Sequence, residues 1–161
     1  MQHRKLGTNG PSVSAIGLGC MSFAGAFGET DEATSHRCLD AAVDHGINFL
    51  DTANIYGMGR SETVLGTWLS RPKQNVVIAS KVGIQRDPDR PVNNDPSYIR
   101  EQLEGTLKRL GVNYIDLYYL HRRDETVPLD DAIGTLIDLM NEGKIRGYGL
   151  SEVAPYTLRL A

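Results

Sequence analysis

Short apolar runs alternate with longer amphipathic stretches along the whole chain of 161 residues. The runs are bounded by turn residues, as buried strands are, whereas the longer stretches repeat apolar residues every three to four positions, as helices do. Strands that are separated by helices pair in parallel through right-handed crossovers. The sequence therefore predicts an α/β fold, either a doubly wound sheet or a (β/α)8 barrel.

The strands and helices are predicted from local signals. An Asn-Gly pair at Asn9 favours a small hairpin over Arg4–Ser14. The predicted strands are Ala15–Gly19, Ile47–Leu50, Val76–Ser80, Tyr114–Leu120 and Ile145–Leu150. The predicted helices start at Thr30 or Asp31, at Ser61, at Asp95 with Pro96, at Pro128 and at Pro155. Gly46 ends the first of them, Gly111 the third and Gly143 the fourth. The residues expected to face inward from them are Leu39, Ala42, Val43, Val64, Leu65, Trp68, Leu69, Ile99, Leu103, Leu107, Leu110, Leu129, Ala132, Ile133, Leu136 and Met140.

The number of strands limits the barrel interpretation. A complete barrel has eight strand–helix units and about 250 residues. This chain supplies about five strands, and its last helix is cut off by the chain end. No linker divides residues 1–161, so we expect a single domain.

Composition narrows the function class. The net charge of -3 argues against a general nucleic-acid or membrane-surface binder. Cys20 and Cys38 are too few for a disulfide framework or a CxxC metal site, which favours a reducing, cytoplasmic compartment. The N-terminus lacks the apolar segment of a signal peptide, and no apolar run approaches the ~20 residues that span a bilayer.

Reactive side chains recur where predicted strands end. Asp51, Lys81 and His121 each follow a strand, and Ser151 with Glu152 follows the last one. In a parallel α/β fold all strand carboxyl ends open on one face, where sites form. Taken singly, each of these residues has an ordinary structural explanation, such as a turn, a cap or a solvated surface group. Their shared placement favours a functional site.

The residue types point to proton transfer at a carbonyl group. Tyr56 follows Asp51 on the same loop. A phenol is ordinarily a weak acid, with a pKa of about 10, and a nearby ammonium stabilises its ionised form. Lys81 is a candidate for that ammonium, Asp51 can hold Lys81 in place, and His121 can donate a hydrogen bond to a substrate oxygen. Such a set suits carbonyl reduction, in which a phenol protonates oxygen as hydride reaches carbon.

Motifs of other dehydrogenases and of metal enzymes are missing. A GxGxxG pattern begins at Gly17, but Ser22 stands where the third glycine belongs. A second pattern begins at Gly147 and ends with Glu152. No lysine lies four residues after any tyrosine, so the YxxxK pair of short-chain dehydrogenases is absent. HExxH, P-loop and zinc spacings are absent as well, and no metal site is predicted.

Five motifs in order carry a family resemblance. They are GLG at Gly17–Gly19, DTANIYG at Asp51–Gly57, ASKVG at Ala79–Gly83, YYLHR at Tyr118–Arg122 and GLSEV at Gly149–Val153. With these motifs the chain resembles the aldo-keto reductase superfamily, whose members are NADPH-dependent (β/α)8-barrel enzymes. The resemblance covers the whole chain but only about the first half of a usual family member.

The resemblance implies roles for single residues. Tyr56 would be the proton donor, Lys81 and Asp51 its tuning pair, and His121 the group that orients the carbonyl of a small substrate. An extended NADPH would lie over the strand carboxyl ends, and Ser151 would bind the nicotinamide carboxamide beside Glu152, where many members have Asn. The cofactor positions implied in this way are Gly19, Cys20, Met21, Asp51, Ser151 and Glu152.

Because the sequence covers only about half of a barrel, more than one state and function of the chain remain open. The later strands that carry the nicotinamide platform and the 2'-phosphate residues are outside this sequence, so NADPH preference comes from the resemblance alone. Two sheet edges and apolar interior positions would be exposed, which favours self-association or a second chain that completes the barrel. The chain is thus a fragment, an assembling half-barrel or an inactive product. As an enzyme it reduces an aldehyde or ketone; as a module it regulates a partner, as channel-associated β-subunits of the family do.

Overall fold

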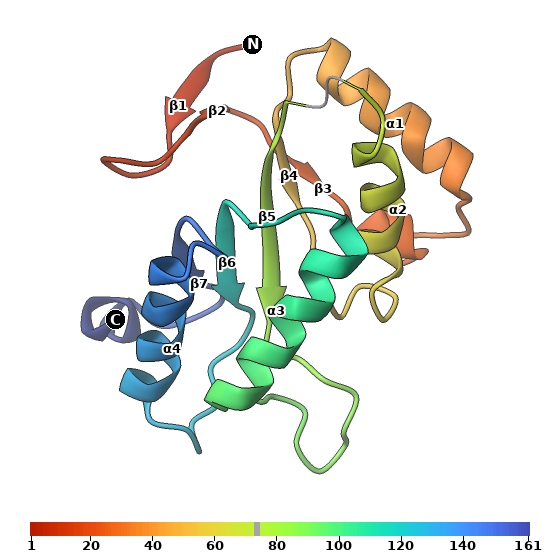
Figure 1. Ribbon diagram of the computed structural model, residues 1–161. Helices are drawn as coiled ribbons and strands as arrows, with labels where there is room; N and C mark the ends of the chain where they lie inside the picture. Colours follow the sequence, from red (N-terminus) through yellow and green to blue (C-terminus); the bar gives the residue numbers. More distant parts are fainter. Residues whose placement is uncertain (73–74) are drawn as a thin grey trace.

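A computed structural model describes residues 1–72 and 75–161 and contains two sheets (Figure 1). The small sheet is the antiparallel hairpin of β1 (His3–Lys5) and β2 (Ser12–Ser14). The large sheet is parallel and five-stranded. Its strands are β3 (Leu18–Gly19), β4 (Phe49–Asp51), β5 (Val77–Val82), β6 (Leu117–Leu120) and β7 (Tyr148–Leu150). The helices are α1 (Glu32–Asp44), α2 (Arg60–Leu69), α3 (Pro96–Leu110), α4 (Leu129–Asn141) and α5 (Pro155–Leu160), with a short 3-10 helix, η1, at Met21–Ala24.

The strand order decides between the two predicted architectures. The strands lie side by side in the order of the chain, β3-β4-β5-β6-β7. A doubly wound sheet reverses its strand order at a switch point, whereas a barrel adds each new strand beside the last one. The sheet is therefore the first part of a (β/α)8 barrel, as the sequence predicts, with the hairpin in front of it.

The helices cover one face of this sheet. Helices α1, α2, α3 and α4 pack against one another in chain order, so they form one layer (Figure 1). The core lies between this layer and the sheet, and Trp68, Leu103 and Leu136 are among its fully buried side chains. Burial alternates along β4 and β6, as expected for strands with one covered and one open face.

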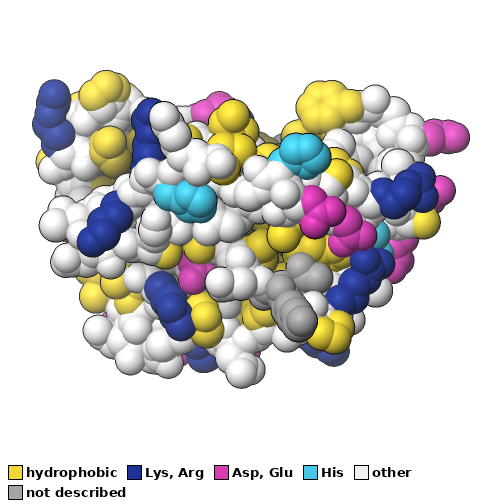
Figure 2. All heavy atoms as spheres, turned by 90° about the horizontal axis from the view of Figure 1, so that it is seen from above, with side chains coloured by type: hydrophobic (Ala, Val, Ile, Leu, Met, Phe, Trp, Pro, Cys, Tyr) yellow, Lys and Arg dark blue, Asp and Glu magenta, His cyan; other side chains and the backbone are white. Residues whose placement is uncertain are grey.

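The open face belongs to what would be the barrel interior. Phe49, Leu117 and Tyr119 alternate with the buried residues of β4 and β6 and remain partly exposed. Within the described residues, β3 and β7 each pair on one side only, which leaves two sheet edges. Seen along the strands from their amino ends, the outline of the molecule dips between two lobes (Figure 2).

The hairpin lies at the amino ends of the strands. The Ser14 N–H donates to Asn48 Oδ1 at 2.6 Å, and Asn48 Nδ2 donates to the Ser12 carbonyl at 3.2 Å. These bonds fasten β2 to the residue that precedes β4. The carboxyl ends of the strands are left free of the hairpin, at the opposite end of the sheet.

Several helix boundaries follow the predicted signals. Asp31 is the cap of α1 and accepts a hydrogen bond from the Thr34 N–H at 2.6 Å. Gly111 ends α3 with a φ of 67°. This is the left-handed conformation, which glycine adopts without a Cβ clash. Asp95 lies at the cap position of α3, but its carboxylate pairs with Arg90 at 2.6 Å instead of capping the helix.

Two predictions about helices are wrong. Ser61 is not the cap of α2, because the cap position is Gly59, two residues earlier, and Ser61 lies within the helix. The Ser61 hydroxyl is buried and bonds the Thr52 hydroxyl at 2.9 Å and the Cys20 carbonyl at 2.8 Å. Met140 does not face inward and is 37% exposed, because Leu139 takes the inward position at the end of α4.

Four of the five strands of the large sheet are shorter than predicted, and the bounds of all five differ from the predicted runs. The first apolar run pairs only at Leu18 and Gly19, and the fourth pairs from Leu117 onward. The third continues two residues beyond its predicted end, so Lys81 lies within β5 rather than after it. Among residues 1–72 and 75–161, no helix combines the length and apolarity needed to cross a bilayer.

Candidate active site

Lys81 joins three groups at the carboxyl end of the sheet. Its side chain is 9% exposed, and Nζ forms an ion pair with the Asp51 carboxylate. Nζ also donates to the Thr52 carbonyl at 2.9 Å and to the Tyr56 hydroxyl at 3.4 Å. The structure thus brings Asp51, Tyr56 and Lys81 together, although 30 residues separate Lys81 from Asp51 in the chain.

The loop after β4 places Tyr56. The Tyr56 N–H donates to the Ala53 carbonyl at 3.2 Å, and the Asn54 N–H donates to the Lys81 carbonyl at 3.2 Å, so the loop is tied to β5. Gly57 has a φ of 60°, and a Cβ there would lie 2.8 Å from the Cβ of Ala24. Only glycine therefore lets this turn close against η1 with Tyr56 in position.

His121 contacts the Tyr56 ring. Its N–H donates to the Val82 carbonyl at 2.7 Å, which fixes the residue at the end of β6. The two rings meet edge to face, with centroids 5.7 Å apart and an interplanar angle of 81°. His121 is 7% exposed, and within the described residues its Nδ1 is buried without a hydrogen-bond partner.

The environment keeps the His121 imidazole neutral. Burial lowers its pKa to about 4, and the positive charges of Lys81 and Arg122 act in the same direction. At neutral pH the ring therefore carries one N–H and no net charge. A neutral imidazole can donate a hydrogen bond to an oxygen atom from this position.

The predicted cofactor positions on β3 and η1 differ in exposure. Gly19 ends β3 with its α-carbon facing open space, and Met21 is 41% exposed. Cys20 is fully buried, its N–H donates to the Asp51 carbonyl at 2.8 Å, and burial raises the pKa of its thiol to about 12. Gly19 and Met21 are accessible at this end of the sheet, whereas Cys20 is an inert part of the core beneath them.

The predicted cofactor positions Ser151 and Glu152 directly follow β7, at the carboxyl end of the sheet. The Ser151 N–H donates to the Leu120 carbonyl at 2.9 Å, so Ser151 lies beside the end of β6. Glu152 has a φ of 51°, which is uncommon for a residue with a Cβ. Its carboxylate pairs with Arg122 at 2.7 Å, and Arg122 Nη1 donates to the His121 carbonyl at 2.8 Å.

Sequence reasoning missed a buried carboxylate behind β5. Glu62 on α2 is fully buried and accepts hydrogen bonds from Ser80 at 2.6 Å and Thr106 at 2.9 Å. Arg109 Nε donates to its other oxygen at 2.6 Å. Because Ser80 directly precedes Lys81, this group fixes β5 against α2 and α3. The available signal was that Glu62 precedes Leu65 by three residues and so shares its buried helix face.

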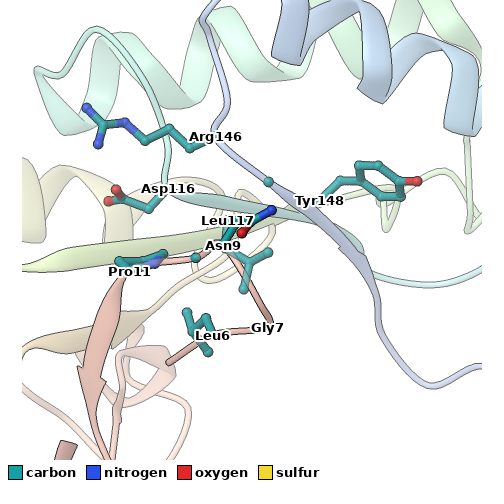
Figure 3. A pocket seen from close by; sticks show the side chains of 10 residues that line it. Leu6, Gly7, Asn9, Pro11, Asp116, Leu117, Arg146 and Tyr148 are labelled. Carbon is teal, nitrogen blue, oxygen red and sulfur yellow. The ribbon is translucent and has the colours of Figure 1, made fainter. Parts of the chain in front are cut away.

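A large cavity lies at the other end of the molecule. It has a volume of about 640 Å³ and lies between the hairpin and the starts of β6 and β7 (Figure 3). Leu6 and Pro11 line it from the hairpin, and Asp116 and Arg146 line it from the sheet. The Asp116 carboxylate accepts the Ile78 N–H at 2.9 Å and has a structural role. The cavity is therefore remote from the cluster around Lys81.

Comparison with known proteins assigns a family. The model of the aldo/keto reductase family matches residues 15–161. A probable aldo-keto reductase 1 of Glycine max is 42% identical over 100% of this chain and 48% of its own length. The aldo-keto reductase yakc [NADP(+)] of Schizosaccharomyces pombe is 37% identical over 98% of this chain and 47% of its own length.

Solved structures give the same result. The holo form of aldo-keto reductase AKR11C1 from Bacillus halodurans superposes with a TM-score of 0.88 at 36% identity, over 99% of this chain and 53% of that one. The glycerol dehydrogenase AKR11B4 from Gluconobacter oxydans superposes with a TM-score of 0.86 at 31% identity, over 98% of this chain and 50% of that one. The chain thus spans about half the length of the relatives that it matches. It belongs to the aldo-keto reductase family.

Proposed function

We propose that this chain carries the proton-transfer group of an NADPH-dependent reductase that converts an aldehyde or a ketone to an alcohol. The observation that carries the proposal is the position of the Lys81 ammonium, which reaches the Asp51 carboxylate and the Tyr56 hydroxyl together. A solvated surface lysine would make neither contact, and its burial would be costly without the carboxylate.

The proposed reaction assigns one task to each side chain. When bound, NADPH would supply the hydride that the carbonyl carbon gains. Tyr56 gives its hydroxyl proton to the carbonyl oxygen, so the product is the alcohol. The Lys81 charge stabilises the phenolate that remains on Tyr56, and Asp51 keeps Lys81 in position. The neutral ring of His121 donates a hydrogen bond to the same carbonyl oxygen and orients the substrate.

Residues at the carboxyl end of the sheet could contact the nicotinamide end of the cofactor. Gly19 pairs with Asp51 at the end of β3, and no atom lies within 4 Å of the position that a Cβ would take there, whereas Ser151, after β7, is partly exposed. A nicotinamide carboxamide needs polar partners, and Ser151 would supply one, while Gly19 and Met21 would be accessible to the cofactor. Preference for NADPH over NADH is supported by the name of the Schizosaccharomyces pombe relative, which includes NADP(+).

We further propose that a second half completes the site. The relatives are about twice as long as this chain, and both edges of its sheet are open within the described residues. The second half is either a continuation of the same polypeptide or a separate chain. Its strands would pair with β7 and β3 and would cover the partly exposed side chains of the open face.

A non-catalytic role is the second candidate. It is favoured by the open sheet, because a half-barrel offers the nicotinamide only one side of its binding surface. In that case the chain binds a partner through its open face and reduces nothing. A module without catalytic function would tolerate substitutions in the four central side chains. The chain keeps all four, Asp51, Tyr56, Lys81 and His121, which favours the reductase.

The test is NADPH oxidation at 340 nm by the chain with an activated aromatic aldehyde. Tyr56→Phe is compared with the wild type, and Tyr156→Phe is the control because Tyr156 is 69% exposed on α5. Turnover that is lost in Tyr56→Phe and kept in Tyr156→Phe supports the proposal. Turnover kept in Tyr56→Phe contradicts the role of Tyr56. A folded chain without turnover in any form excludes a stand-alone enzyme, so the chain is then either a reductase half that needs its second half or a non-catalytic module.

A further inference from the structure

Two loops start next to the side chains of the site. The loop over residues 83–95 follows β5, which carries Lys81, and the loop over residues 121–128 starts with His121. The first loop folds back on itself, because Ile84 and Val92 form an antiparallel bridge. Gln85 Nε2 also donates to the Arg90 carbonyl at 2.6 Å. This loop is therefore an ordered unit that can act as an anchor.

Asp124 connects the second loop to this anchor. It is 7% exposed, and its carboxylate accepts hydrogen bonds from Arg90 Nη2 at 2.9 Å and from the Thr126 N–H at 2.9 Å. The Thr126 hydroxyl donates to the same carboxylate at 2.5 Å. The Asp124 N–H donates to Asn94 Oδ1 at 2.7 Å. Asp124 thus contacts the first loop through both its side chain and its backbone.

Asn94 brings the connection to the end of β5. It is 1% exposed, and its Nδ2 lies 2.7 Å from the point where a Cβ on Gly83 would stand. Gly83 has a φ of 121°, so a larger residue is excluded by both backbone and space. A continuous set of contacts therefore runs from the end of β5 through Asn94 and Asp124 to the loop that starts at His121.

Asp124 carries a negative charge although it is buried. Burial opposes ionisation of Asp124, but the hydrogen bonds from Thr126 and Arg90 outweigh it and hold the pKa of the carboxyl below its usual value. Arg90 also pairs with Asp95 at 2.6 Å, so one guanidinium bridges two carboxylates. Removal of one partner from a pair with a buried member is more costly than removal from an exposed pair.

We propose that Asp124, with Arg90, is a positioning residue that keeps His121 enclosed beside Tyr56 and Lys81 by fastening the loop after β6 to the loop after β5. Its importance for catalysis rests on the proposed function, whereas the fastening itself is a property of the chain. Asp124 touches none of the reacting groups, and it acts through the placement of His121.

The test follows the His121 imidazole by NMR in the 161-residue chain labelled with 13C-histidine. The variants are Asp124→Asn and Arg90→Met, and the control is Glu125→Gln, a substitution at an exposed neighbour. In Asp124→Asn and Arg90→Met the midpoint of the His121 titration is expected to rise by about one unit, a tenfold change in proton affinity, because water reaches the ring. In Glu125→Gln it is expected to stay at the wild-type value.

The sign separates a loosened loop from a simple charge effect. Loss of the Asp124 charge without movement would lower the midpoint, because a negative group near an imidazolium favours the charged form. The positive groups that face His121, Lys81 and Arg122, are unchanged in these variants. A rise in Asp124→Asn therefore reports entry of water and not loss of charge.

Amide hydrogen exchange over residues 84–92 gives the second readout, with faster exchange expected in both variants and partial recovery in Arg90→Lys. If Asp124→Asn does not fold, Arg90→Met decides, because its guanidinium is partly exposed. An unchanged His121 midpoint with unchanged exchange in a folded variant overturns the proposal. Neither readout uses cofactor or turnover, so failure here and failure of the proposed reductase activity are distinguishable.

Discussion

The four central side chains show how far single residues can be inferred from sequence. The clustering of Asp51, Lys81 and His121 could be predicted, because each lies in or next to the end of a strand, where parallel folds gather their sites, and Tyr56 joins them from the loop after β4. The burial of Cys20 could not be predicted, because it depends on how η1 folds over β3. Pairs such as Arg122 with Glu152 also need the fold, because they join different loops.

His121 gives a prediction about pH. Its folded pKa of about 4 lies below its usual value, so between pH 6.5 and pH 4 the unfolded chain binds more protons than the folded chain. Stability therefore falls as the pH is lowered through this window. Between pH 7 and pH 5 we expect His121 to account for a loss of about 2 kcal/mol in the free energy of unfolding.

Urea unfolding at a series of pH values measures this effect, with His121→Gln as the comparison. The variant is expected to show a shallower fall in stability over the same window. Equal slopes in the wild type and in His121→Gln would show that the imidazole is not kept neutral by its surroundings. His45→Gln is a suitable control, because that ring is exposed at the end of α1.

At the scale of elements, the order and type of strands and helices could be predicted, but their boundaries could not. A strand ends where its neighbour stops pairing, which is why the run that starts at Ala15 contributes only Leu18 and Gly19. The register of a helix face drifts along its length, which is why Leu139 and not Met140 ends the buried stripe of α4. These details depend on tertiary contacts that the local pattern does not contain.

The contact between α2 and α3 gives a second prediction. A Cβ on Gly66 would lie 2.1 Å from the Arg109 carbonyl oxygen, so the two helices approach closely only because residue 66 is glycine. Gly66→Ala is expected to lower the free energy of unfolding by about 2 kcal/mol or more, in spite of the better helix propensity of alanine.

Gly134→Ala is the matched control for Gly66→Ala. Gly134 lies within α4, and no atom is within 4 Å of the position that its Cβ would take. The control is expected to gain about 0.5–1 kcal/mol, because alanine favours the helix where space allows it. Chemical denaturation of both variants checks the pair. A neutral Gly66→Ala would show that the helices are not held at this distance.

At the scale of the whole molecule, the sheet is open on one face and at two edges. The parallel pairing of the strands could be predicted from the alternation of runs and stretches, whereas the barrel type is implied by the family resemblance and is decided by the strand order. The partial exposure of Leu117 follows from that order, because the barrel interior is covered only when the strands close.

The open face gives a third prediction. We expect the isolated chain to self-associate in a concentration-dependent way, because exposed apolar side chains and unpaired strand edges favour association. Leu117→Lys on the open face is expected to shift the weight-average mass toward the monomer in sedimentation experiments. Ile137→Lys is the control, since Ile137 is 44% exposed on α4, away from the open face. If Ile137→Lys lowers the weight-average mass more than Leu117→Lys does, the chains associate through the helical layer and the prediction is wrong.

The central claim is that these residues form the proton-transfer half of a carbonyl reductase. The direct measurement is NADPH oxidation at 340 nm, with an aromatic aldehyde, by a chimera. The chimera joins this chain to the part of the Bacillus halodurans relative that the chain does not match. We expect turnover, with kcat lower by about 10²- to 10⁴-fold in Tyr56→Phe. A folded chimera that binds NADPH and turns over equally fast with phenylalanine at position 56 would contradict it.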